Sequence, residues 1–127
     1  MIKTNVEKNK LVVAFEPTIF SGAATTAGAI IDTLGFESLS IYTAVGAFVA
    51  GILTVDSIKE SNAAAMTGAT AIASTGTFTA QVADGIGGSW VLPTKRYVQI
   101  TLDGDATADF NAAAVAVLSN ASKEPTV

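Results

Sequence analysis

The sequence predicts an all-β fold, a single-domain antiparallel β-sandwich with a jelly-roll-like winding. The clearest apolar periodicity along the chain is two, the period of a strand that buries one face. Strands of this kind are short, number about seven or eight, and alternate with turn signals, as in sandwiches and jelly rolls. The length of 127 residues suits one domain with its own core.

Residues 1–20 are expected to form an N-terminal arm followed by the first strand. The arm, residues 1–10, is polar and lacks an apolar centre, so it does not resemble a signal peptide. It is locally basic and is expected to extend and order against a partner. The apolar run at 11–15 predicts the strand. Pro17 indicates either that the strand ends there or that it lies at the edge of a sheet.

Residues 21–118 are expected to form the sandwich core. Small polar residues at 21–28 predict a loop or a weakly paired strand, and 29–33 predict a short strand. The next two predicted strands are 36–45 and 52–60, and their alternation predicts which side chains share a face. In the first strand, one face carries Leu39, Ile41, Thr43 and Val45. In the second, Leu53, Val55 and Ser57 face away from Thr54, Asp56 and Ile58.

The uncharged run at 38–55 is long enough to imitate a membrane span. Serine and threonine residues interrupt this run, and it also contains Gly46 and Gly51. Two strands joined by a glycine-containing turn therefore explain the run better than one helix, and no membrane partner is expected.

The segment at 62–83 is uncharged and rich in Ala, Thr and Gly. A helix over 63–73 is possible because Ala favours helices, but Thr and Gly favour loops with a short strand near 77–82. Residues 84–88 predict a turn.

The C-terminal part alternates again at 97–102, with Val98, Ile100 and Leu102 on the core face. A polar turn is expected at 103–109 and a last strand at 112–118, in which Val115 and Val117 share a face. Residues 119–127 are expected to form a flexible tail.

Charge is scarce, at 14% of residues against a usual share of about 25%, and the net charge is −4. An acidic chain whose seven basic residues are dispersed does not present the basic face that nucleic acid or an anionic membrane attracts. Few charges and many small residues favour a surface that meets other protein, and the alternative is a domain with a neutral surface.

No enzyme and no cofactor are expected. The chain has neither His nor Cys, and no G-x-S-x-G motif places a serine nucleophile. The glycine-rich stretch at 84–88 lacks the Lys and Ser/Thr of a phosphate-binding loop. Asp103, Asp105 and Asp109 form a weak metal candidate, because a Ca²⁺ loop needs more ligands than they provide. A solvated turn is the favoured interpretation.

Apolar side chains are more numerous than one small core needs, and Trp90 can serve as a core or interface anchor. Phe78 belongs to the same surplus. The residues expected to contact a partner are Lys3, Val6, Lys8, Lys10, Phe48, Ile52 and Trp90.

Three stretches resemble a known family. Residues 31–39, IDTLGFESL, resemble the "IDT-x-G-[FY]-E-S" strand of small virion proteins of tailed bacteriophages. Residues 59–61, KES, resemble the "QES" strand end, and 95–102, KRYVQITL, resemble the "KRYVR-x-x-L" strand. The similarity spans residues 23–118. The sequence differs from the family pattern after residue 61. The family continues "QESDDG", whereas this chain has Asn-Ala-Ala at 62–64.

This resemblance implies a structural virion protein, a capsid decoration (cement) protein located on the capsid surface and assembled in the host cytoplasm. Its partners would be the major capsid protein and further copies of itself, with a trimer favoured and a dimer open. A tail or neck protein of the virion is a further possibility. The alternative from another class is a carbohydrate- or receptor-binding β-sandwich module, which predicts an exposed aromatic cleft with polar neighbours. The decoration protein predicts a flat apolar patch.

Overall fold

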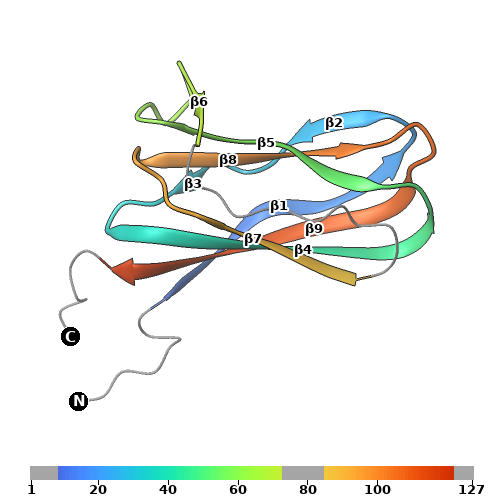
Figure 1. The fold of residues 1–127 in the computed structure, drawn as a ribbon, viewed down its shortest axis with the longest axis horizontal. Coiled ribbons are helices and arrows are strands. Elements are labelled where there is room, and N and C mark those ends of the chain that lie inside the picture. The colour runs from blue at the N-terminus through green and yellow to red at the C-terminus, as the bar shows by residue number, and fades with distance from the viewer. Residues whose placement is uncertain (1–8, 73–84, 122–127) are drawn as a thin grey trace, which may run out of the picture.

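A computed structural model describes residues 9–72 and 85–121, which form strands in two antiparallel sheets, with none of these residues in a helix. The two sheets lie one over the other as a β-sandwich, which confirms the predicted all-β class (Figure 1). In chain order, the strands are β1 (Lys10–Ser21), β2 (Ala24–Ala27), β3 (Ile31–Asp32), β4 (Phe36–Ala50), β5 (Leu53–Ser61), β6 (Thr70–Ala71), β7 (Gly85–Val91), β8 (Tyr97–Gly104) and β9 (Asp109–Ala121).

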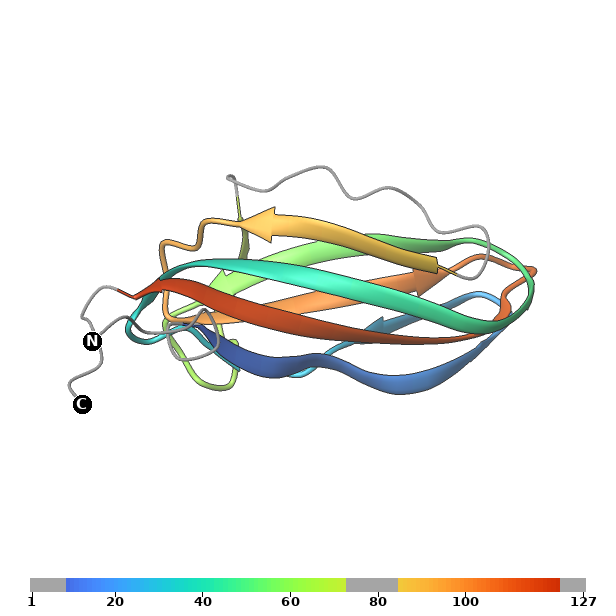
Figure 2. The same ribbon diagram turned by 90° about the horizontal axis from the view of Figure 1, so that it is seen from below.

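Sheet A has the strand order β1-β9-β4-β7, and Figure 2 looks onto these four strands. Sheet B has the order β2-β8-β5-β6, with β3 pairing to β8 beyond the end of β2. The predicted strands at 36–45 and 52–60 correspond to β4 and β5, which belong to different sheets. The uncharged run at 38–55 is therefore a strand, a turn and the start of another strand, and the described residues contain no helix that could span a membrane.

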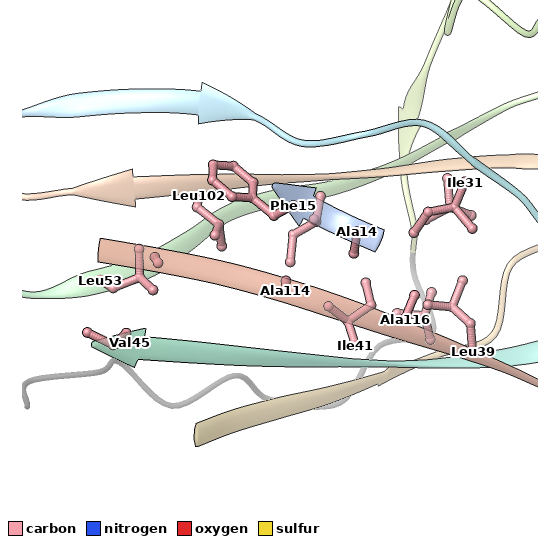
Figure 3. Close-up of a cluster of buried hydrophobic side chains, with 14 of the residues drawn as sticks. Ala14, Phe15, Ile31, Leu39, Ile41, Val45, Leu53, Leu102, Ala114 and Ala116 are labelled. Carbon is pink, nitrogen blue, oxygen red and sulfur yellow. The ribbon is translucent and has the colours of Figure 1, made fainter. Parts of the chain in front are cut away.

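The core lies between the sheets (Figure 3). The predicted inward faces of β4 and β8 are confirmed, since their alternating side chains are buried. These are Leu39, Ile41, Thr43, Val45, Val98, Ile100 and Leu102. Toward one end of the sandwich the core is aromatic, because Phe20 stacks with Phe15 and Phe110 at centroid distances of 5.9 and 5.3 Å.

In the middle of strand β9, alanines are buried and a larger valine is exposed. Ala112, Ala114 and Ala116 face the core, whereas Val115 faces out and is 44% exposed. Phe15 of β1 lies directly opposite Ala114 in the register. Since the interior is close-packed, the alanines of this central strand leave room for the large rings of neighbouring strands.

The predicted faces of β5 are wrong after Val55. A register shift between Val55 and Ser57 inserts one extra residue opposite β8, as in a β-bulge. Ile58 consequently packs against the core, and Ser57 pairs with Thr101, a neighbour on the solvent side. Simple alternation failed because one bulged residue reverses every later side chain.

Several predicted boundaries also change. Strand β1 continues past Pro17 to Ser21, with Pro17 at a register shift on the sheet edge. The predicted turn at 84–88 is largely strand β7, and the described part of 63–73 forms turns and β6 instead of a helix.

Strand β9 extends to Ala121, so the predicted tail begins later than residue 119, and the predicted polar turn at 103–109 is shortened to 105–108. Residues 1–8 of the predicted arm, the strand near 77–82 and the remainder of the tail lie outside the described residues.

Candidate functional site

The three carboxylates of the weak metal candidate have separate surroundings, and one of them, Asp105, holds a turn. Asp105 accepts hydrogen bonds at Oδ1 from the Thr107 amide and hydroxyl, at 3.2 and 3.1 Å, and its carbonyl accepts from the Ala108 amide. Asp103 lies in β8 and accepts from the Thr25 hydroxyl at 2.9 Å. Asp109 is exposed at the start of β9. Within residues 9–72 and 85–121, no three acidic, His or Cys side chains are grouped to hold a metal.

At one end of the sandwich, charged groups fasten the segment between β7 and β8. Arg96 donates to both carboxylate oxygens of Asp32, at 2.9 and 2.8 Å, and this pairing lowers the pKa of Asp32 to about 2. The buried Glu60 accepts from the Thr94 amide and hydroxyl, both at 2.7 Å, and from the Lys95 amide. Burial alone raises the pKa of Glu60, but these hydrogen bonds outweigh it and hold the pKa below its usual value.

These side chains hydrogen-bond to one another and to the backbone, and they hold the segment between β7 and β8 in place. An open cavity of about 300 Å³ lies between β1 and the end of β2 with the residues that follow it, lined by Phe15, Glu16, Thr18 and residues 26–29. Among the described residues that line it, Glu16 carries the one carboxylate.

The most distinctive surface is the solvent side of sheet A, called the outer face from here on. Of the twelve large apolar residues that are exposed in the described ranges, seven lie on it. They are Leu11, Val13, Ile19, Tyr42, Ile86, Trp90 and Val115. One row crosses all four strands, from Val13 through Val115 and Tyr42 to Gly88.

Charge is confined to the margins of the outer face. The four strands of sheet A contain Lys10, Glu16, Glu37 and Asp109 as their charged residues. Three of these lie at or next to a strand end, and Glu16 lies within the second register shift of the edge strand β1. A patch this apolar, with a charged margin, is typical of a surface that contacts protein.

The solvent side of sheet B is different in kind. The register of β8 against its neighbours places polar residues across that face. They are Thr25, Thr54, Ser57, Lys59, Gln99, Thr101 and Asp103. The sandwich therefore has one face suited to water and one suited to a partner.

The residues predicted as contacts are scattered over the molecule. Trp90 lies on the outer face and is 51% exposed. Lys10 is exposed at the start of β1, and Ile52 is partly exposed in the turn between β4 and β5. Phe48 packs against the core, with its ring 5.9 Å from that of Phe110. Lys3, Val6, Lys8 and Phe78 lie outside the described residues.

The other exposed apolar residues of the outer face were not predicted as contacts from the sequence, although β9 has a sequence pattern that indicates such a face. A strand with one face in water normally alternates apolar and polar residues. In β9, the run Ala-Ala-Ala-Val-Ala-Val-Leu at 112–118 is apolar on both faces, which is typical of a strand covered on both sides. Identifying the face also requires the strand order, which brings β1, β4, β7 and β9 together.

Comparison with family models, curated protein sequences and solved structures finds no match to this chain. Its function is therefore inferred from its own residues and geometry.

Proposed function

We propose that this chain is a structural virion protein, a capsid decoration (cement) protein that binds the outside of an assembled tailed-phage head and stabilises it. The observation that carries the proposal is the outer face of sheet A, which is largely apolar and charged only at its margins. Such a face favours burial against protein, because removing its apolar side chains from water is favourable and costs little desolvation of charge.

The winding of the chain also supports this proposal. When β2 and β3 are counted as one interrupted strand, residues 9–72 and 85–121 contain eight strands. The first pairs with the last, the second with the seventh, the third with the sixth and the fourth with the fifth. This nesting is the order of a jelly roll, and we propose that finer class for the fold. Capsid and lectin domains both use jelly rolls, so the fold alone does not choose between them.

The sequence resemblance supports the capsid role over the lectin role, and so do the surroundings of the exposed aromatic residues. A sugar site combines an aromatic platform with polar groups that bind hydroxyls. Tyr42 and Trp90 do lie close on the outer face, but Ile86 and Val115 lie beside them, and the polar side chain paired with Trp90 is that of Ser40. The apolar neighbours offer no hydrogen bonds to a sugar, and Ser40 adds one hydroxyl.

In the proposed mechanism, each copy contacts neighbouring subunits of the major capsid protein, and many modest contacts sum to high avidity. A protein that binds the assembled shell and not its free subunits stabilises the shell by linkage. The protein would then belong to the capsid surface of virions assembled in the host cytoplasm.

Co-sedimentation of the purified chain with assembled heads of its phage, and with unassembled capsid subunits, tests the function. Binding is expected to heads alone, with a higher temperature of head disruption. Absence of binding to heads would defeat the proposed function.

A matched pair of variants tests the outer face. Val115→Glu places a charge at the middle of the outer face, and Thr101→Glu does so in β8, the corresponding central strand of sheet B. We expect Val115→Glu to weaken head binding at least about tenfold, a loss of about 1.4 kcal/mol, because a buried carboxylate without a partner is costly. Thr101→Glu should bind as the wild type does. Equal binding by both variants would show that another surface makes the contact.

A further inference from the structure

Three of the four edges of the two sheets are interrupted in ways that discourage pairing with another strand. On β1, Pro17 cannot donate a backbone hydrogen bond, and the register shifts at two places. The opposite edge of sheet B is divided between β2, with four residues, and β3, with two. The remaining edge of sheet B, β6, has two residues. Short, bulged and proline-containing edges are the usual protection against edge-to-edge association.

Strand β7 lacks these protections. Its seven residues, Gly-Ile-Gly-Gly-Ser-Trp-Val, contain no charge and no proline. Its register with β4 runs from the Leu39–Val91 pair to the Val45–Gly85 pair without a shift. On its other side, no strand of the described residues pairs with it. A regular edge of this length presents backbone N–H and C=O groups that can continue the sheet.

We propose that β7 pairs antiparallel with β7 of a second copy of this chain, across a two-fold axis at Gly88, and so joins the two A sheets. A two-fold axis places residues equally distant from Gly88 opposite each other. Trp90 of each subunit then lies opposite Ile86 of the other on the outer face. An aromatic side chain opposite a β-branched one is a favourable cross-strand pair.

The composition of β7 suits contact with itself. In a two-fold contact a charge close to the axis lies near its own copy, and like charges directly opposite are destabilising. Strand β7 has none. Ile86 is 77% exposed and Trp90 51% exposed, so each subunit brings the same two uncovered apolar side chains to the contact. The joined sheets also extend the apolar outer face without a polar break.

This contact specifies a dimer instead of the trimer that the family resemblance favours. It does not rest on the proposed role in a virion, because the edge and its side chains are properties of the isolated chain. If the chain does not bind heads, the proposed dimer is unaffected. If the chain does not dimerise, the proposed head binding through the outer face is unaffected.

Crosslinking at Gly88 tests the axis directly, because the chain contains no other cysteine. Paired residues on antiparallel strands have Cα atoms about 4.5–5.5 Å apart, within the range of about 4.4–6.8 Å that a disulfide spans. A Cβ atom at Gly88 meets the Tyr42 ring at 3.4 Å, the closest contact, so Gly88→Cys should fold. We expect more than about half of this variant to form a disulfide dimer under mild oxidation at micromolar concentration. The control is Ala44→Cys, on the outer face of β4, which should stay monomeric.

A folded Gly88→Cys protein that stays monomeric would overturn the proposal, and so would equal crosslinking by Ala44→Cys. A second pair of variants tests the register without cysteine. I86K/W90E places opposite charges across the axis, and I86E/W90E places like charges there. In sedimentation analysis at low salt, we expect the first to dimerise at least about tenfold more tightly than the second. Equal dissociation constants would rule out the proposed register.

Discussion

Thr43 is a fully buried threonine whose hydroxyl has no hydrogen-bond partner in the described part of the chain. It faces the core from the middle of β4. A buried polar group without a partner costs about 1–3 kcal/mol. Valine has the same branched shape and strand preference but no hydroxyl. We expect Thr43→Val to raise the free energy of unfolding by about 1 kcal/mol in urea denaturation.

Thr33 provides the matched control for this substitution. It is also buried, but its hydroxyl donates to the Arg96 carbonyl at 2.6 Å. Thr33→Val should therefore lower the free energy of unfolding by about 1 kcal/mol, the net contribution of one hydrogen bond. If both valine variants are destabilised alike, Thr43 must have a partner, and its hydroxyl is not a defect of the core.

At the scale of elements, Gly28 is where the segment after β2 comes closest to β1. Its amide donates to the Ile100 carbonyl, and the next amide, of Ala29, donates to the Ala14 carbonyl in sheet A. A Cβ atom at Gly28 would lie 2.3 Å from the Ala14 carbonyl oxygen, which is backbone and cannot turn aside. The glycine thus permits a direct backbone bond between the two sheets.

We expect Gly28→Ala to lower the free energy of unfolding by about 2–3 kcal/mol, since the two backbones must move apart. Gly46→Ala is the control, because a Cβ atom there meets nothing within 4 Å. That variant should stay within about 0.5 kcal/mol of the wild type. Thermal or urea unfolding measures both, and a neutral Gly28→Ala would show that the close approach is absent in solution.

Sequence alternation predicted the buried face well where no register shift interrupts the predicted stretch, and in β4 the shift comes only after Gly46. β4 and β8 each keep their pattern through the core, so reading every second residue identified their buried faces. The bulge of β5 leaves no local sequence mark, because its extra residue is defined by the register with β8. Strand β7 resembles a turn by composition, since three of its seven residues are glycine, and only its pairing with β4 makes it a strand.

The candidate site depends on the same long-range information. Leu11, Tyr42, Ile86 and Val115 are unremarkable apolar residues in the sequence, where nothing says which apolar side chains face out. In β9, hydrophobicity alone favours valine over alanine for the core, yet the alanines are inside. Side-chain volume determines which residues of β9 face the core, because Phe15 lies opposite Ala114 and a larger side chain there would leave its ring no space.

For the molecule as a whole, charged side chains are distributed unevenly between the two solvent-facing sheet surfaces. The solvent side of sheet B carries Lys59 and Asp103 among its polar side chains, whereas the outer face of sheet A has charge only at its margins and uncharged polar side chains such as Ser40 and Asn111. Much of the missing charge is therefore missing from one surface. A general lowering of surface charge would have left both faces alike, and the asymmetry agrees with the proposed contact of the outer face with protein.

Acid should destabilise the whole molecule through one end of the sandwich. There, Asp32 pairs with Arg96, and Glu60 accepts hydrogen bonds from Thr94 and Lys95, so two carboxylates fasten the segment between β7 and β8 to β3 and β5. The pKa of each carboxyl is lowered in the folded state, that of Asp32 to about 2. In the unfolded chain these groups titrate near their ordinary values of about 3.9 and 4.3.

A carboxyl whose pKa is lowered by folding stabilises the native state fully above its unfolded pKa, and this contribution is lost as the pH falls through the folded pKa. We expect the free energy of unfolding to be nearly constant from pH 7 to about 5 and to decline between about pH 4.5 and 2. The variant D32N/E60Q keeps the side-chain shapes but removes both titrations. It should be less stable than the wild type at pH 7, and its stability should change less below pH 4.5. Urea denaturation at a series of pH values measures both curves, and parallel curves would show that other carboxyls control the acid response.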